Sequence, residues 1–415
     1  MDGKPNDNDK VTPIARTNWR NSDVLFGIKQ KDRRSHMYII GKTGTGKSTL
    51  IENMINSDIQ VGHGVALIDP HGDLVESILD LVPEKRIDDV IYFNPADLAY
   101  PIAFNPLEKV HPDYHHLVAS GIVSIFKKIW PDFWGPRLEH ILRHAVMTLL
   151  EYPDSTLLDL PKLLTDDKFR IEVLKHVTHP QVKEFWYADF GKINPRSRHE
   201  AVSPILNKMG QFLISLPLRN IVGQRGNSFD LKKVTDEGKI LLVNLAKGKI
   251  GEDNCAVLGA MLVTMIWLAT MSRTDRPENA RRPFYLYVDE VHNFLTLSFA
   301  DTMSESRKYG LNLILAHQYI DQLDVDIRNA IFGNAGTIIS FRIGARDAKH
   351  IALEFHPDIN ETDLVNLANY DVYLKMMIDG EISKVFSATT MPESKIDRSY
   401  RREIIWISRK KYGRR

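Results

Sequence analysis

Short apolar runs alternate with helical stretches along the first hundred residues. The runs HMYII, VALID and VIYF each have the length of a buried strand, and helices are expected from Gly46 and over residues 74–81. The alternation resumes after residue 216 with KILLVNL, FYLYVDE, LNLILAHQ, GTIISFRI and finally YLKMMI with ISKVFSA. Strands that alternate with helices are typical of a parallel sheet with crossover connections. The pattern predicts one α/β domain made of residues 21–106 and 217–392.

The segment between these two halves has a different period. Three stretches, LVASGIVSIFKKIW, RLEHILRHAVMTLL and AVSPILNKMGQFLI, repeat apolar residues at helical spacing. Apolar positions three and four residues apart form one face of a helix. Residues 107–216 are therefore predicted to form an all-helical insertion in the α/β domain.

Both ends of the chain are polar. Residues 1–20 are predicted to be a flexible N-terminus, and residues 1–10 lack the apolar segment that a signal peptide needs. Residues 393–415 hold nine basic and three acidic side chains, a net charge of +6. This basic C-terminal tail either contacts the phosphates of DNA or is simply a solvated tail. The net charge of the whole chain gives no argument for nucleic-acid binding, because its 54 basic residues nearly balance its 53 acidic ones.

The first strand runs directly into GKTGTGKSTLI, which contains the phosphate-binding pattern GxxxxGK[ST] between a strand and a helix. Its glycines permit a tight loop whose N–H groups point at a phosphate, and the helix N-terminus adds partial positive charge. Lys47 is expected to reach the β- and γ-phosphates, and Ser48 to ligate Mg²⁺. The alternative, a glycine turn before a helix, rarely occurs in this strand context. The predicted nucleotide-binding residues are Gly41, Thr43, Gly44, Thr45, Gly46, Lys47, Ser48 and Thr49.

The strand FYLYVDE ends in two carboxylates, Asp289 and Glu290. Such a pair is either two solvated acids at the rim of a sheet or the Walker B motif of an ATPase, and the P-loop favours the second explanation. Asp289 would then ligate Mg²⁺, and Glu290 would orient the attacking water, as a general base or a positioning group. The next strand ends in Gln318, which either faces the γ-phosphate as a sensor or is a rim amide.

One long apolar stretch, 17 residues from Cys255, lies at the lower limit for a membrane span. A span there would place the P-loop and the Walker B strand on opposite sides of a membrane, so a buried helix is predicted instead. Cys255 is the single cysteine of the chain, which excludes an internal disulfide and fits a reducing compartment. A cytoplasmic protein is therefore expected.

Four segments, GKTGTGKSTL, IDPHGDL, YVDEVHNF and ESRKYGLNLILAHQY, carry a likeness that extends over residues 24–388. Together they resemble the HerA/FtsK superfamily of hexameric DNA-pumping ATPases, and within it the soluble motor of the TraG/TraD-type coupling ATPases of conjugation. The resemblance implies a RecA-like P-loop NTPase core of the ASCE class with an inserted all-α domain, which hydrolyses ATP with Mg²⁺. It also implies a homo-oligomeric ring, a hexamer, with ATP at the subunit interfaces and DNA in the pore.

In such rings a neighbouring subunit supplies an arginine to the γ-phosphate, and the motif match assigns this role to Arg307. Arg342 is the second candidate and Arg328 the third. Each can instead be a surface arginine that pairs with an acid such as Glu305 or Asp347.

Asp69 and His71 lie in the DPHGDL segment, which is beside the nucleotide in the family. Asp69 either assists the water network around Mg²⁺ or forms the turn of an Asp-Pro sequence. The sequence leaves both explanations open.

Coupling ATPases usually begin with a membrane anchor and HerA proteins with a small β-barrel, and neither is expected before residue 21. The leading hypothesis is an ATP-driven DNA translocase that acts in conjugative DNA transfer with a secretion-system or relaxase partner. One alternative is a type IV secretion ATPase that transports protein. The other is a HerA-like scaffold of a repair or antiphage complex with a nuclease partner.

Two further clusters are predicted to be structural. His140 and His144 share a helix face, but no carboxylate or cysteine completes a zinc set. The aromatic residues at 130–134 and 185–187 can stack bases, although such residues in a helical domain more often form its core.

Overall fold

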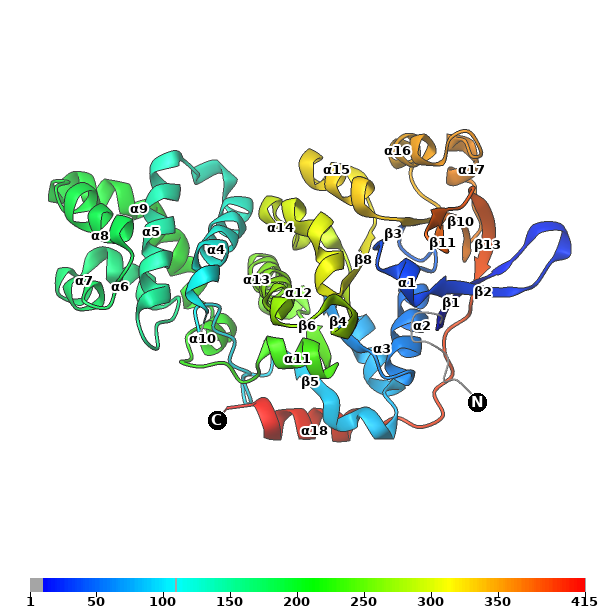
Figure 1. The fold of residues 1–415 in the computed structure, drawn as a ribbon, viewed down its shortest axis with the longest axis horizontal. Helices are drawn as coiled ribbons and strands as arrows, with labels where there is room; N and C mark the ends of the chain where they lie inside the picture. Colours follow the sequence, from blue (N-terminus) through cyan, green and yellow to red (C-terminus); the bar gives the residue numbers. More distant parts are fainter. Residues whose placement is uncertain (1–9, 109, 415) are drawn as a thin grey trace. The chain divides into compact units, whose positions relative to one another are not determined.

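The computed structural model describes residues 10–108 and 110–414, and the chain divides into two compact units. The first, named the sheet unit here, comprises Met1–Phe93, Lys232–Asn244 and Ala269–Ser408. The second, the helical unit, comprises Asn94–Leu231, Leu245–Leu268 and Arg409–Arg415. The strands labelled in Figure 1 all belong to the sheet unit.

The sheet unit is built on an eleven-stranded mixed sheet whose parallel part consists of short, buried strands. These strands are β3 (Met37–Ile40), β4 (Gly64–Asp69), β5 (Val90–Phe93), β6 (Ile240–Asn244), β7 (Phe284–Val288), β8 (Leu311–His317) and β9 (Thr337–Ser340). Continuous apolar runs are expected there, because both faces of such a sheet are covered. The spatial order is β9-β3-β8-β7-β4-β6-β5. The strand β8 therefore lies between the P-loop strand β3 and the Walker B strand β7, as the predicted α/β fold requires.

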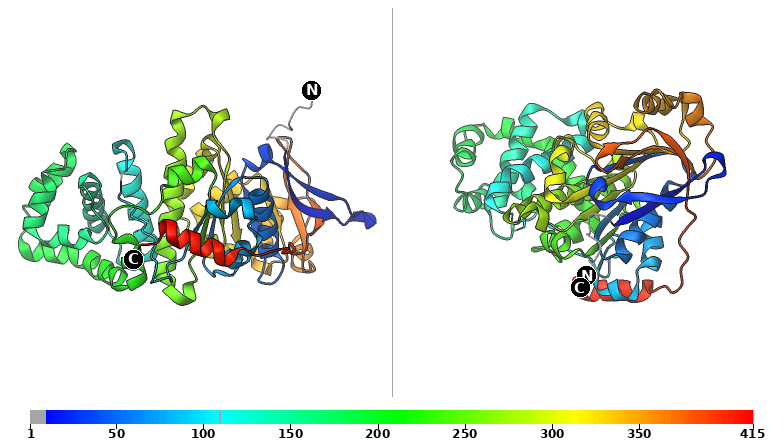
Figure 2. Two further views of the ribbon diagram at one scale, coloured as in Figure 1. Left: turned by 90° about the horizontal axis from the view of Figure 1, so that it is seen from below. Right: turned by 45° about the vertical axis from the view of Figure 1, so that its right-hand side comes forward.

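Antiparallel strands extend the sheet beyond β9 in the order β10 (Asp371–Lys375), β13 (Phe386–Thr390), β1 (Val11–Thr17) and β2 (Leu25–Lys29). The prediction of a flexible N-terminus is wrong for residues 11–20, because β1 pairs with β13 and buries Ile14 and Ala15. Residues 1–9 of that prediction lie outside the described residues. Figure 2 shows the β1–β2 hairpin projecting from the sheet. A separate small hairpin joins β11 (Met377–Ile378) to β12 (Glu381–Ile382).

Helices α2 (Lys47–Gln60) and α3 (Asp73–Leu81) pack on one face of the sheet. Leu50 and Met54 of α2 and Ile78 of α3 join one apolar cluster with Ile39 and Leu67 of the sheet. Burying each such side chain contributes about 1.5–3 kcal/mol, so the cluster fixes α2 against the strand that precedes it. The other helices in or next to this unit are α1 (Gln30–Arg33), α11 (Leu231–Glu237), α14 (Leu297–Thr302), α15 (Val325–Asn334), α16 (Ala345–Phe355) and α17 (Glu361–Val365).

The basic C-terminal segment is folded and is not a solvated tail. Helix α18 spans Arg401–Tyr412 and buries Ile404 in the same apolar cluster. The backbone N–H of Tyr92 donates to Oγ of Ser408 at 2.9 Å. Charge alone misses this arrangement, because the run EIIWI places isoleucines among the basic side chains and gives the helix an apolar side.

The helical unit contains the three helical segments that the sequence predicts and several more. Its elements are α4 (His115–Ile129), α5 (Pro136–Glu151), α6 (Asp159–Thr165), α7 (Asp167–Leu174), α8 (Pro180–Glu184), the π-helical turn η6 (Phe185–Phe190), α9 (Pro195–Ile214), α10 (Leu216–Val222), α12 (Lys247–Ile250) and most of α13 (Glu252–Met271), up to Leu268. The unit extends beyond the predicted insertion at 107–216, because the flanking segments bond to each other. Phe104 N–H donates to the Ile221 carbonyl at 3.1 Å, and Ala103 N–H donates to Ser228 Oγ at 2.9 Å.

Helix α13 contains the long apolar stretch that starts at Cys255. Among the described residues, one helical stretch, Glu252–Asp275, has the length and apolar composition of a membrane span, and 72% of its most apolar window is buried. Leu258, Leu262 and Ile266 are fully buried. The prediction of a buried helix is confirmed.

Candidate active site

The phosphate-binding loop lies between β3 and α2, where the sequence predicts it. Gly46 caps α2 with a φ of +117°, and Gly44 has a φ of +74°, conformations that favour glycine. A Cβ atom on Gly46 would lie 2.8 Å from Cδ1 of Tyr370 and 3.0 Å from Cε1 of Phe341. Glycine is therefore required there both by the backbone and by the two aromatic rings that pack against the loop.

Lys47 is buried in the first turn of α2, and its side chain points back into the loop. Nζ donates to the carbonyl oxygen of Gly41 at 2.5 Å and to that of Lys42 at 3.3 Å. Burial lowers the pKa of Lys47, and the carboxylates of Asp289 and Glu290 oppose that shift. The ammonium group is thus held in the P-loop within electrostatic reach of the Walker B carboxylates.

The hydroxyl groups of the loop fall into two classes. Thr45 and Thr49 are buried, and Thr45 Oγ1 donates to the Lys42 carbonyl at 2.7 Å, which stabilises the loop. Thr43 and Ser48 are exposed. These two exposed hydroxyls can reach a phosphate or a metal ion bound in the loop.

Asp289 and Glu290 follow the last residue of β7 in a strained turn. Glu290 has φ 47° and ψ 55°, a left-handed conformation that residues other than glycine rarely adopt. Its N–H donates to Oδ1 of Asp289 at 3.0 Å. Strain of this kind, of order 1–3 kcal/mol, is concentrated at functional sites. Because β3 and β7 are parallel, the turn places both carboxylates at the sheet edge that carries the P-loop.

Gln318 follows β8 and connects the two halves of the site. Thr43 Oγ1 donates to Oε1 of Gln318 at 2.8 Å. Nε2 of Gln318 in turn donates to Oε1 of Glu290. The amide therefore has a partner in the P-loop and a partner in the Walker B turn, which is the placement that a γ-phosphate sensor needs.

Three carboxylates gather at this edge of the sheet. Burial raises the pKa of Asp289 to about 7, together with the negative charges of Glu290 and Asp69, and Lys47 only partly opposes the shift. A divalent cation beside Asp289 would relieve this repulsion, and oxygen ligands are those that Mg²⁺ prefers. The donor set of Asp289 and Ser48 thus fits a Mg²⁺ site.

Asp69 has a structural role in the turn after β4. Its Oδ1 accepts from the backbone N–H of His71 at 2.8 Å, and its Oδ2 accepts from that of Val75 at 3.1 Å. Both oxygens thus support the start of α3, which favours the turn explanation. The carboxylate still acts on the site through its charge, which contributes to the raised pKa of Asp289.

Arg307 lies on the turn η10 (Met303–Tyr309), which precedes β8. Arg307 is exposed, and its guanidinium group donates to the Asn334 carbonyl at 2.9 Å. Among the described residues no carboxylate shifts its pKa, which is lowered by burial. The P-loop is at the other end of β8. Since the seven residues of β8 rise about 3.3 Å each, Arg307 is roughly 20 Å from the nucleotide loop of its own chain.

Arg342 has the opposite placement, beside its own P-loop. Its carbonyl oxygen accepts from the backbone N–H of Lys42 at 2.9 Å, and its guanidinium donates to Asn369 Oδ1 at 2.8 Å. This position suits contact with a nucleotide in the same chain rather than in a neighbour. Arg328 is partly exposed on α15.

The structure adds three residues to which the sequence analysis gave no role. Tyr370 is 44% exposed, and its N–H donates to the Thr45 carbonyl at 2.8 Å. Tyr370 is far from the P-loop in the sequence and belongs to no recognisable motif. His292 and His317 lie within quoted segments, YVDEVHNF and LNLILAHQY, and both are next to Glu290. Only the pairing of β7 with β8 reveals that these two histidines are neighbours.

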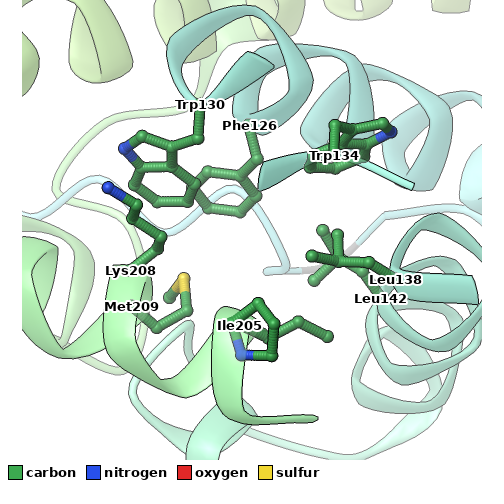
Figure 3. Close-up of a pocket in the computed structure, with 9 residues that line it drawn as sticks. Phe126, Trp130, Trp134, Leu138, Leu142, Ile205, Lys208 and Met209 are labelled. Atoms are coloured by element: carbon green, nitrogen blue, oxygen red, sulfur yellow. The ribbon is translucent and has the colours of Figure 1, made fainter. Parts of the chain in front are cut away.

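In the helical unit, aromatic side chains line a pocket between α4, α5 and α9 (Figure 3). Phe126 and Trp130 stack with ring centroids 4.9 Å apart. Figure 3 shows Lys208 and Met209 of α9 on the same side of the pocket as Trp130. Trp130 and Trp134 of the first aromatic run are partly exposed and line this pocket, whereas the side chain of Phe133 lies outside the described residues.

The histidine pair of α5 packs against the second aromatic run. The rings of His140 and His144 are 4.3 Å apart, and both contact the ring of Phe185. Phe185 and Trp186 are buried, which confirms the predicted core role, whereas the prediction is wrong for Tyr187, which is 64% exposed. Tyr187 lies on a π-helical turn, whose altered spacing rotates it away from the buried side.

Comparison with known proteins agrees with the P-loop fold described above. Residues 25–356 match the profile of the type IV secretion-system coupling protein DNA-binding domain. None of the proteins with curated descriptions matches the sequence.

Several solved structures share the fold over nearly the whole chain. The plasmid coupling protein TrwB in complex with ADP and Mg²⁺ has a TM-score of 0.65 and 14% identity, over 95% of this chain and 92% of that chain. TrwB with a non-hydrolysable GTP analogue has a TM-score of 0.63 and 15% identity, over 95% of this chain and 93% of that chain. VirB4 of Thermoanaerobacter pseudethanolicus has a TM-score of 0.58 and 15% identity, over 94% and 98%. These matches confirm the predicted RecA-like P-loop fold.

Proposed function

The chain belongs to the family of type IV secretion-system coupling protein DNA-binding domains, and from this premise we propose that it is an ATP-driven DNA translocase of conjugative transfer. One observation carries the proposal: the contacts from Thr43 through Gln318 to Glu290 join the P-loop to the Walker B turn. The connection supports the proposal because a P-loop ATPase holds a water-orienting residue near the γ-phosphate.

ATP and Mg²⁺ are the cofactors of this proposal. TrwB has been solved with ADP and Mg²⁺, and the donor set in this chain fits the same pair. The P-loop N–H groups and Lys47 would hold the phosphates, while Ser48 and Asp289 would hold the metal. Mg²⁺ held there would supply positive charge that offsets the negative charge of the phosphates.

Three side chains of the site act on the attacking water and the γ-phosphate. Glu290 accepts a hydrogen bond from the water and aligns it. It can take the proton as the water oxygen bonds to the γ-phosphorus and the bond from that phosphorus to the departing ADP oxygen breaks. Gln318 faces both groups, so its amide responds when the γ-phosphate arrives or leaves. Lys47 stabilises the negative charge of the phosphate oxygens from inside the loop.

The distance between Arg307 and the P-loop of its own chain supports a ring. An arginine roughly 20 Å from its own site cannot reach that nucleotide, but it can serve the site of a neighbour across an interface. We therefore include a homo-oligomeric ring, a hexamer by resemblance to the family, with Arg307 in trans. DNA passes through the ring, and the cytoplasm is the compartment in which ATP and DNA are both available.

The test is steady-state ATP hydrolysis by the full chain with no polymer, with duplex DNA and with single-stranded DNA. DNA translocation predicts that one or both DNA forms raise the rate, and Lys47→Ala removes the activity in every condition. Electron microscopy of the same samples should show rings. Stimulation by a secreted protein but not by DNA would instead favour a protein-transport ATPase, and no stimulation in a stable complex with a nuclease would favour a scaffold.

A further inference from the structure

Three potential metal ligands converge beside the Walker B turn. The ligand atoms of Glu290, His292 and His317 all lie within 4.8 Å of one another. Glu290 and His292 come from the turn after β7, where η9 spans Val291–Asn293, and His317 is the last residue of β8. Two adjacent strand ends therefore present two imidazoles and one carboxylate to the same point.

The contacts around the cluster orient each ligand. Nδ1 of His292 lies 3.5 Å from Oε2 of Glu290, while Oε1 of Glu290 accepts from Gln318. Nδ1 of His317 lies 3.3 Å from the phenol oxygen of Tyr38. The tautomer in which this Nδ1 donates to Tyr38 leaves Nε2 with a lone pair. Metal-bound histidines commonly donate their second ring nitrogen in this way, which fixes the ring.

We propose that Glu290, His292 and His317 form a site for a borderline transition-metal ion such as Zn²⁺, and that the bound ion inhibits ATP hydrolysis. Two histidines and one carboxylate, with water as a fourth ligand, form a common zinc set. Mg²⁺ prefers oxygen ligands, so its own site at Asp289 and Ser48 is chemically distinct.

The geometry needs only a small adjustment. Zn²⁺ holds nitrogen and oxygen ligands at about 2.0–2.2 Å, so two ligands of one tetrahedral ion are about 3.4 Å apart. Donor atoms within 4.8 Å of one another can close on an ion when the side chains shift by less than about 1 Å. His317 and Glu290 are buried and His292 is partly exposed, which leaves an approach for the ion on one side.

Inhibition follows from the identity of the carboxylate. A Glu290 side chain that ligates Zn²⁺ cannot align water, whereas Lys47, Ser48 and Asp289 remain able to hold nucleotide. Zn²⁺ should therefore stop turnover and leave nucleotide binding in place. This step rests on the proposed role of Glu290 in hydrolysis, but the metal site itself does not.

Metal binding is measured first, on the full chain without nucleotide. Equilibrium dialysis against Zn²⁺ and visible absorption of bound Co²⁺ both report the site independently of activity. His292→Asn should weaken binding of either ion by at least about tenfold, since one of three ligands is lost. His199→Asn, an exposed histidine on α9 of the helical unit, is the matched control and should bind as the wild type does.

Hydrolysis is then measured in metal-buffered solutions that keep free Zn²⁺ constant despite chelation by ATP. Zn²⁺ should inhibit the wild type and His199→Asn at the concentration at which it binds. Each variant is compared with its own rate at zero Zn²⁺, and His292→Asn should require at least about tenfold more Zn²⁺. His317→Gln serves as a second variant, after thermal unfolding shows that it is folded.

The outcomes separate the two proposals. Zn²⁺ binding that is equal in the wild type and in His292→Asn, or no binding at all, would overturn the metal site. Binding that depends on His292 but leaves the hydrolysis rate unchanged would support the site and count against Glu290 as the water-activating group. Binding with parallel loss of turnover and retained nucleotide binding supports both.

Discussion

Gln318 donates a hydrogen bond from Nε2 to Oε1 of Glu290, and its Oε1 accepts one from Thr43 at 2.8 Å. One amide thereby ties the glutamate that would activate water to the loop that would hold the phosphates. The oxygens of a γ-phosphate in the P-loop would compete for both donors, the Thr43 hydroxyl and the Gln318 Nε2 group. Binding or loss of the γ-phosphate would therefore change the hydrogen bond that Gln318 donates to Glu290.

Replacing Glu290 by Gln should stop hydrolysis while nucleotide binding remains. The amide keeps the size of the side chain and a hydrogen-bond acceptor for Gln318, but it cannot accept a proton, so turnover should fall by about 10²–10⁴. Fluorescent ATP-analogue binding beside steady-state turnover checks this. Glu305→Gln, an exposed glutamate on η10, is the control. Turnover of Glu290→Gln near that of the wild type would remove Glu290 from the mechanism.

Replacing Gln318 by Ala should have a smaller effect than Glu290→Gln. The variant keeps the carboxylate and loses the group that positions it, so we expect a fall in kcat of about tenfold or more with little change in the KM for ATP. The matched control is Gln322→Ala, an exposed glutamine a few residues further on. A Gln318→Ala enzyme with wild-type kcat would show that this amide has only a local structural role.

His36 gives the fold a pH dependence whose sign can be worked out. Its ring is buried, Nδ1 accepts from the backbone N–H of Leu313 at 3.2 Å, and Nε2 bonds to Ser306 Oγ at 2.6 Å. Burial lowers the pKa of His36 to about 4, and the charge of Arg307 contributes. Between pH 4 and pH 6.5, the usual pKa of histidine, His36 is protonated in the unfolded chain but not in the folded one. Its contribution to stability is therefore complete above pH 6.5 and is lost as the pH falls towards 4.

We expect the free energy of unfolding of the wild type to fall by a few kcal/mol over that range through this group. His36→Asn tolerates the left-handed backbone at this position, φ 58°, and removes the titrating ring. It should be less stable at pH 7 and lose less stability on acidification. Urea unfolding at several pH values measures the difference, and equal slopes for the two proteins would exclude His36 as the source.

The parts of the fold that the sequence predicts share one property, which is local patterning. HMYII, VALID and FYLYVDE are continuous apolar runs that are buried as β3, β4 and β7, and the glycines at 44 and 46 adopt the left-handed conformations that the P-loop pattern requires. These features depend on residues next to each other in the chain.

The features that the sequence analysis missed depend on pairing between distant segments. β1 is a strand because it pairs with β13 near the other end of the chain, and the N-terminal run alone does not show it. Tyr370 reaches the P-loop because β10, which follows it, pairs with β9, and β9 pairs with the P-loop strand β3. His292 and His317 become neighbours only because β8 lies beside β7.

The C-terminal helix should contribute to stability. Ile404 is fully buried, so Ile404→Ala leaves a cavity in the apolar cluster and should lower the free energy of unfolding by about 2–5 kcal/mol. Thermal unfolding should show a fall in Tm of several degrees. Ile396→Ala, an isoleucine with 52% exposure just before the helix, is the control. Equal Tm values for the two variants would mean that α18 is not docked in solution.

The last basic residues are also bonded to the rest of the chain. Arg409 pairs with Asp97 at 2.7 Å, and the backbone N–H of Arg414 donates to the Pro101 carbonyl at 3.0 Å. Deleting residues 409–415 would remove these contacts together with the positive charge, so the DNA affinity of such a variant has to be compared with its thermal unfolding.

Arg307 is the residue whose role depends most on assembly. It is exposed, it lies at the end of β8 away from its own P-loop, and its neutral partner, the Asn334 carbonyl, does not balance its charge. Arg307→Ala alone should lower turnover by about 10³-fold or more if it serves a neighbour's γ-phosphate. A broken surface contact would cost far less, at most about fivefold in any equilibrium.

Mixing distinguishes a neighbour's arginine from a cis arginine. Arg307→Ala subunits keep Glu290, and Glu290→Gln subunits keep Arg307, so a mixed ring contains interfaces at which an intact Arg307 faces an intact Glu290. Turnover should therefore rise above that of either variant at intermediate ratios, in the presence of DNA and after subunit exchange has been verified. Arg342→Ala mixed in the same way should give no such rise, because Arg342 lies beside the P-loop of its own chain. A wild-type rate for Arg307→Ala, or complementation by Arg342→Ala instead, would move the trans role from Arg307 to Arg342.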